Sequence, residues 1–109
     1  MKGIEFWGDS LDVIRGLPEP ARTAIGYQLD RVQRGLQPDD FKPMGSVGPG
    51  VEEIRVRMSG NAYRVIYVAR LEDAVHVLHA FTKKSQKTNK RDLSLADRRF
   101  KQMQAHRGG

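Results

Sequence analysis

The stretch of residues 51–87 constrains the fold most, because it is typical of three consecutive β-strands joined by short turns. Apolar and charged side chains alternate over 51–57, a period of two that places them on opposite faces of a strand. Residues 62–69 are β-branched and aromatic, as in a central strand, and a third strand is predicted over 75–82. Residues 58–61 include a glycine and an asparagine, which tolerate positive φ, so they predict the first turn.

Cationic side chains occur along the whole predicted meander. An antiparallel arrangement would bring together Arg55, Arg57, Arg64, Lys83 and Lys84. Like charges gathered on one sheet face repel each other, so such a cluster is better suited to holding a polyanion. Two alternatives are open. The first is that Arg55 and Arg57 are simply a solvated strand face. Arg64 could also pair with Glu52 or Glu53 across the hairpin.

The bulk properties indicate one globular domain, residues 1–109, with a modest core. No window approaches the ~18 apolar residues of a membrane span, and the N-terminus lacks the pattern of a signal peptide. We therefore expect a cytoplasmic protein that does not span a membrane. The chain has no cysteine, which excludes disulfides and cysteine-bound metals. His76 and His79 are predicted to lie on opposite faces of one strand, so we expect no metal and no cofactor.

Positive charge is concentrated at the C-terminal end. Residues 1–82 contain 10 Lys or Arg and 11 Asp or Glu, whereas residues 83–109 contain 9 and 2. The corresponding net charges of −1 and +7 add to the +6 of the chain. A basic end on a nearly neutral body indicates nucleic acid, an acidic protein or a membrane surface as partner. The alternative is a helix whose charged face is simply solvated.

The other segments predict a β-α-α-β-β-β-α order. A short strand over 3–7 precedes helices over 10–16 and 21–34, and their short link indicates a helical hairpin. Residues 37–50 hold three prolines and three glycines and predict a loop. The last helix is predicted over 89–104. We expect an α+β fold in which the helical hairpin covers one face of a small, mostly antiparallel sheet.

Two helix ends have predicted capping residues, and the last helix has a predicted buried stripe. Asp9 or Ser10 can cap the first helix, and Thr88 can cap the last. The apolar residues of the last helix recur at helical spacing and form one narrow stripe, namely Leu93, Ala96, Phe100 and Met103. Its remaining surface is cationic, with Lys90, Arg91, Arg98, Arg99 and Lys101.

Several short motifs occur in a fixed order within residues 50–88. They are Glu-x-Arg before the first turn, Tyr-Arg-x-x-Tyr after it, and a hydrophobic-His-x-Phe-x-Lys-Lys run that leads to Gln-Lys-Thr. In this order and spacing they resemble the RelE/ParE superfamily of bacterial toxins, above all its HigB-like, phage Gp49-like branch. In its order of elements the resemblance extends over residues 1–104.

The resemblance implies a RelE-like toxin of a type II toxin–antitoxin system. Its implied partners are a cognate antitoxin of the helix-turn-helix type, mRNA and the 70S ribosome. The implied activity is metal-independent, ribosome-dependent cleavage of mRNA, which inhibits translation. Two other functions stay open, a ParE-like inhibitor of DNA gyrase and a non-catalytic RNA-binding domain.

Residue roles follow from the resemblance by position. Arg64 would stabilise the transition state while Arg55 and Arg57 grip the RNA backbone, since fixed guanidinium groups suit both tasks. Lys83 or Lys84 would transfer the proton, and family position favours Lys84. Phosphates of mRNA or rRNA would be bound by Lys87, Arg98, Arg99 and Lys101. No tyrosine follows Tyr67, so the C-terminal catalytic tyrosine of RelE has no counterpart, and Asn89 replaces a proline usual in HigB-like relatives.

Overall fold

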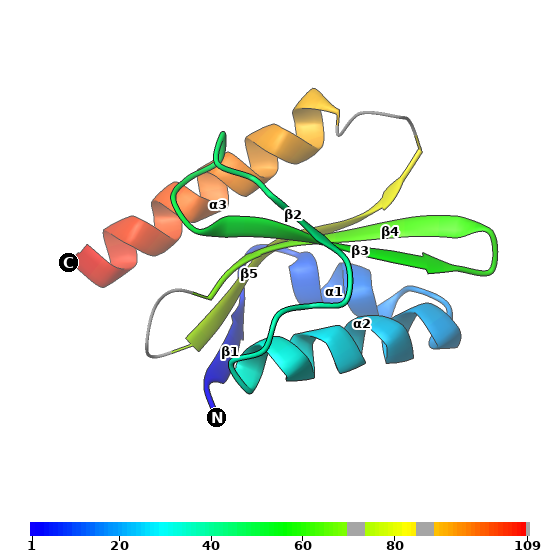
Figure 1. The fold of residues 1–109 in the computed structure, drawn as a ribbon. Helices are drawn as coiled ribbons and strands as arrows, with labels where there is room; N and C mark the ends of the chain where they lie inside the picture. Colours follow the sequence, from blue (N-terminus) through cyan, green and yellow to red (C-terminus); the bar gives the residue numbers. More distant parts are fainter. Residues whose placement is uncertain (70–73, 85–88, 109) are drawn as a thin grey trace.

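A computed structural model of the protein describes residues 1–69, 74–84 and 89–108. Within these ranges, three helices pack on the two faces of a five-stranded mixed sheet, which is an α+β fold as expected (Figure 1). The elements are β1 (Gly3–Phe6), α1 (Ser10–Arg15), α2 (Glu19–Gln33), β2 (Phe41–Pro43), β3 (Val51–Met58), β4 (Asn61–Val68), β5 (Ala74–Lys83) and α3 (Lys90–Gly108). The strand order is β1-β5-β4-β3-β2, in which β1 and β5 are parallel and the other pairs antiparallel.

The edge strand β2 corrects the prediction that residues 37–50 form only a loop. Phe41 pairs with Ile54 and Lys42 with Glu53, so the short strand extends the sheet by one position beyond β3. Pro43 has no N–H to donate, which suits a strand at an edge. The element order is therefore β-α-α-β-β-β-β-α, with one strand more than the sequence predicts.

Each face of the sheet has its own hydrophobic core. Helices α1 and α2 cover one face, where Ile25 and Leu29 pack against buried residues of β3, β4 and β5. We call this the hairpin face and the opposite one the α3 face. On the α3 face the predicted stripe of the last helix is buried, and Ala96, Phe100 and Met103 join Ile66 and Leu78 in the second core. Neither α3 nor any other helix within the described ranges is long and apolar enough to cross a membrane.

A β-bulge in β5 changes the facing of its histidines. Ile66 of β4 pairs with His79, but the next residue, Tyr67, pairs with Val77, so Leu78 is an extra residue. Strict alternation fails across the bulge, and both His76 and His79 lie on the α3 face. The prediction that they occupy opposite faces is therefore wrong. Across the described ranges, no three His, Asp or Glu side chains are grouped to hold a metal ion.

Candidate nucleic-acid interface

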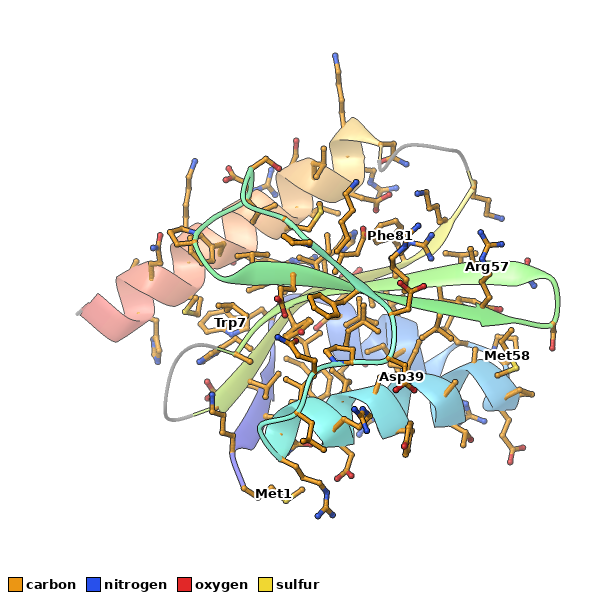
Figure 2. All side chains as sticks on the ribbon, in the orientation of Figure 1. Met1, Trp7, Asp39, Arg57, Met58 and Phe81 are labelled. Atoms are coloured by element: carbon orange, nitrogen blue, oxygen red, sulfur yellow. The ribbon has the colours of Figure 1, made fainter. Side chains whose placement is uncertain are left out.

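Cationic side chains from four strands meet on the α3 face, toward the hairpin that joins β3 and β4. The strand pairing shows why they share this face: Arg55 lies opposite Arg64, Lys42 lies opposite Glu53, and Ala62 has Arg57 and Lys83 as its two neighbours. Figure 2 shows Arg57 near the end of the sheet where β3 turns into β4, away from most of α3. We name these five residues the cationic cluster: Lys42, Arg55, Arg57, Arg64 and Lys83.

The structure thus brings together four of the five cations that the meander predicts. Lys42 is the member that the sequence does not reveal, because it belongs to a segment predicted to be a loop. Only its pairing with Glu53 places it beside the others. Lys84 lies one residue past the end of β5 and is exposed.

Arg64 is the buried centre of the cluster, with a side chain only 3% exposed. Its Nε lies 3.6 Å from Oε1 of Glu53, which is equally buried, and its Nη1 donates to the Tyr63 carbonyl at 3.0 Å. Burial lowers the pKa of Arg64, and although Glu53 opposes this shift, Arg55 and Arg57 add to it. The pairing of Arg64 with Glu53, one of the two alternatives open from the sequence, is present.

One donor of this guanidinium lacks a hydrogen bond. Nε is buried, and no described residue accepts a hydrogen bond from it. A buried donor without an acceptor costs about 1–3 kcal/mol. Such costs are found in native proteins chiefly where a polar group has a task beyond stability.

Lys83 is the lysine at the end of β5 that belongs to the cluster. It is half-buried, and partial desolvation together with nearby Arg64 lowers its pKa. Arg55 and Lys42 lower the pKa of Lys83 further, while Glu53 opposes them. A lysine with a lowered pKa has a larger neutral fraction at a given pH, which is what proton transfer by an amine requires.

The cations of α3 divide into exposed and buried ones. Arg98 and Lys101 are exposed, and Lys101 forms an ion pair with Asp97 at 3.0 Å. Arg99 is buried, so the prediction that it lies on the cationic solvent face is wrong. Its guanidinium donates to the Leu78 carbonyl and to Asp9, partners far away in the sequence. Lys87 lies outside the described residues.

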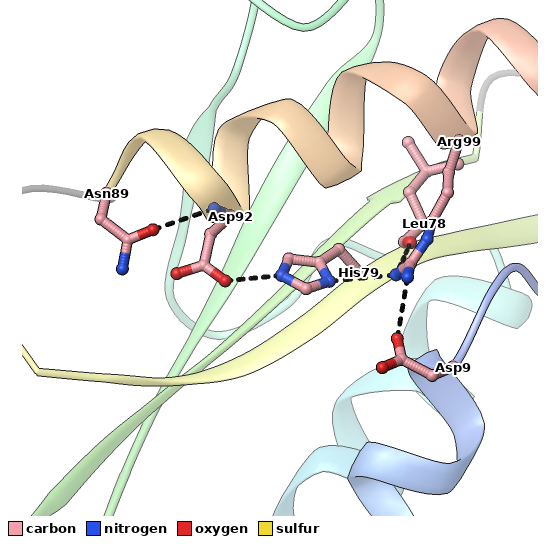
Figure 3. A network of polar contacts seen from close by, with 6 residues as sticks. All are labelled: Asp9, Leu78, His79, Asn89, Asp92 and Arg99. Atoms are coloured by element: carbon pink, nitrogen blue, oxygen red, sulfur yellow. Dashed lines mark hydrogen bonds and ion pairs between the residues drawn. The ribbon is translucent and has the colours of Figure 1, made fainter.

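A polar network on the α3 face explains why Arg99 turns inward (Figure 3). Its Nη1 lies 3.1 Å from His79 Nδ1, and its Nη2 lies 2.9 Å from Asp9 Oδ1. Because arginine can only donate, His79 Nδ1 accepts, and its Nε2 donates to Asp92 at 2.7 Å. Both ring nitrogens are thus occupied, and His79 is a hydrogen-bonded packing residue that stacks on Phe81. The Asp9 side chain makes no capping hydrogen bond to α1.

Asn89 caps helix α3. Its Oδ1 accepts the Asp92 N–H at 2.9 Å, which satisfies one of the free donors in the first turn. The predicted cap, Thr88, lies outside the described residues. Asn89, which stands where HigB-like relatives usually have a proline, therefore supplies a capping hydrogen bond to α3.

A comparison with protein families identifies the chain. The model of the family described as Phage derived protein Gp49-like (DUF891) matches residues 12–101, a span that includes the entire cationic cluster. The chain belongs to this Gp49-like family. It is a family of RelE/HigB-like toxins, which suggests a toxin of a toxin–antitoxin system with an antitoxin as partner. No curated protein matches the chain.

Proposed function

We propose that this protein is the toxin of a type II toxin–antitoxin pair and that it cleaves mRNA on the 70S ribosome, which stops translation. The observation that carries the proposal is the cationic cluster, in which four strands direct positive charge around the buried pair of Arg64 and Glu53. Such a surface is costly for stability and suited to a phosphodiester. Membership of a family associated with toxin endoribonucleases supports the same conclusion.

The cleavage itself needs no metal ion. The 2′ oxygen of a ribose attacks the adjacent phosphorus and loses its proton, and the bond from phosphorus to the 5′ oxygen breaks. The products are a 2′,3′-cyclic phosphate and a 5′-hydroxyl group, once the leaving oxygen has taken up a proton. The protein must therefore hold the backbone, stabilise the extra negative charge at phosphorus and move protons.

Each of these tasks has a candidate in the cluster. Arg55 and Arg57 grip the RNA backbone, because guanidinium groups can hold two phosphate oxygens at once. Arg64 stabilises the charge that develops at phosphorus. Lys83 is the proton-transfer group, since it shares a face with Arg64 and its pKa is lowered by desolvation and by that arginine.

Phosphates away from the cut are bound by the cations of α3 and of the segment before it. We assign this role to Arg98 and Lys101, which are exposed, and to Lys87. Arg99 is removed from the set because its guanidinium is engaged by Asp9 and His79. The cognate antitoxin is a protein of the helix-turn-helix type that neutralises the toxin in the resting cell.

The decisive experiment maps the 5′ ends of messages after brief induction of the toxin. We expect new ends within coding regions for the wild type and a loss of about 10²–10³ in cleavage rate for Arg64→Lys. This change keeps a positive charge beside the buried Glu53, so the variant should stay folded, which thermal unfolding verifies. Arg22→Gln, an exposed arginine of α2, serves as the control.

Three outcomes would overturn the proposal. Normal cleavage by Arg64→Lys would remove Arg64 from the chemistry. Inhibition of DNA gyrase without new message ends would favour the ParE-like function. Binding of RNA without cleavage by the wild type would leave a non-catalytic RNA-binding domain.

A further inference from the structure

Strand β3 has an uncovered edge near the turn that joins it to β4. Strand β2 pairs with β3 only at Glu52, Glu53 and Ile54, and the Asp40 carbonyl accepts the N–H of the next residue, Arg55, at 2.9 Å. Strand β3 continues to Met58. In the described part of the chain, no strand lies beside residues 56–58 on the side away from β4.

The backbone of Arg57 points out of this edge. The Arg55 N–H points to Asp40 and thus away from β4. Backbone groups alternate in direction along an antiparallel strand, so the N–H and C=O of Arg57 point the same way as those of Arg55. An edge with outward N–H and C=O groups is a template for one more strand.

A mostly apolar hollow of about 590 Å³ lies next to this edge on the hairpin face. Met58, the last residue of β3, forms one part of its wall, and the first half of α2 forms the rest. Tyr27 of α2 lines it and is 56% exposed, which is unusual for so large an aromatic side chain. A hollow bordered by an exposed aromatic ring is suited to apolar side chains of a partner.

The opposite side of the same edge is cationic. Arg57 is exposed and Arg55 half-buried, and both belong to the α3 face. A strand added beside residues 55–58 would direct alternate side chains to the two faces. One set would reach the apolar hollow near Met58, and the other would reach Arg55 and Arg57.

We propose that this edge binds an extended segment of a protein partner in which apolar and acidic residues alternate. The segment adds a strand to β3, buries its apolar side chains against Tyr27 and Met58, and pairs its carboxylates with Arg55 and Arg57. The occupant is a polypeptide, because phosphates would use the two arginines but neither the hollow nor the strand edge. Bound there, the segment covers part of the cationic cluster and competes with RNA.

The inference takes from the proposed function only the existence of a protein partner, the antitoxin. Its test measures binding without cleavage, so failure of the nuclease proposal and failure of this one are distinguishable. The probe is a fluorescent peptide of about seven residues in which leucine and aspartate alternate. The control peptide has the same composition with the leucines and the aspartates in separate blocks. We expect the alternating peptide to bind the full chain at least roughly tenfold more tightly.

Backbone methylation of the peptide tests strand addition directly. Only alternate N–H groups of an added strand face its neighbour, so methylation of one alternate set should abolish binding and methylation of the other should leave it unchanged. Equal effects of both sets would overturn strand addition, because the side chains of the two peptides are identical.

Variants of the protein test the hollow. Tyr27→Glu should weaken binding of the alternating peptide by roughly tenfold or more. Leu36→Glu is the matched control, since among the described residues Leu36 is the other large apolar side chain that is about half exposed. Arg57→Gln should weaken binding and also reduce its salt dependence. Unaltered binding by Tyr27→Glu, or equal loss in Leu36→Glu, would contradict the proposed site.

Discussion

Arg64 lies where a side chain for stability alone would not be expected. It faces Arg55 directly across the β3–β4 pair, and like charges in opposite positions destabilise a sheet. Glu53 compensates for only part of this, since its carboxylate is 3.6 Å from Nε, longer than a hydrogen bond. The shared face of Arg55 and Arg64 could be predicted from alternation. The burial of Arg64 could not, because it depends on how the side chains around it pack.

Lys83 and Lys84 should differ sharply in what their removal does to cleavage. Lys83→Ala should lower message cleavage by about 10²–10⁴-fold, as loss of a proton-transfer group does, whereas Lys84→Ala should have little effect. The reason is that Lys83 shares a face with Arg64, which helps to lower its pKa, whereas Lys84 is exposed beyond the strand. The rate at which each variant cleaves a ribosome-bound message measures the effect of the two substitutions. The structure thus favours Lys83, where family position favours Lys84.

A third variant distinguishes proton transfer from simple attraction. Lys83→Arg keeps the positive charge but cannot lose its proton, so it should be nearly as inactive as Lys83→Ala. To act as a base, Lys83 must be neutral. Because its pKa is lowered, the cleavage rate should rise with pH at a lower pH than an ordinary lysine would require. Full activity of Lys83→Arg would reduce Lys83 to a phosphate-binding cation.

Helices and strands that have their own periodicity could be predicted from the sequence. The meander over 51–83 and the stripe of α3 follow from periods of two and 3.6 within one continuous stretch. Strand β2 has three residues and no period, and only pairing with β3 orders it. The bulge at Leu78 leaves no signal in the sequence. Arg99 turns inward because of Asp9, which lies 90 positions earlier in the chain.

The start of α3 provides a prediction about stability. Asn89→Ala removes the oxygen that accepts the Asp92 N–H and should lower the free energy of unfolding by about 1 kcal/mol. For a domain of this size, the expected fall in Tm is roughly 3–6 °C. Ser94→Ala, at an exposed position within α3, is the control and should change Tm little. Equal Tm values for wild type and Asn89→Ala would show that the cap contributes nothing to stability.

The two faces of the sheet are covered to different extents. The hairpin face is covered by α1 and α2, whereas the α3 face carries a hydrophobic core under α3 and the cationic cluster toward the turn between β3 and β4. The sequence predicts a basic C-terminal end, but the fold adds to it the cations of the sheet. RNA is thus expected to contact both the cluster and the exposed side of α3.

Salt dependence measures how many of these cations bind phosphate. Each phosphate that a cation neutralises releases counterions, so the logarithm of the affinity for single-stranded RNA should fall linearly with the logarithm of salt concentration. The double variant Arg98→Gln, Lys101→Gln should reduce this slope by roughly one per lost contact and leave Tm unchanged, because the exposed pair of Lys101 with Asp97 contributes little stability. The control, Arg15→Gln with Arg22→Gln, removes the same charge from exposed positions of α1 and α2 and should keep the wild-type slope. If both double variants lowered the slope equally, RNA would respond to net charge alone, and α3 would have no specific part in binding.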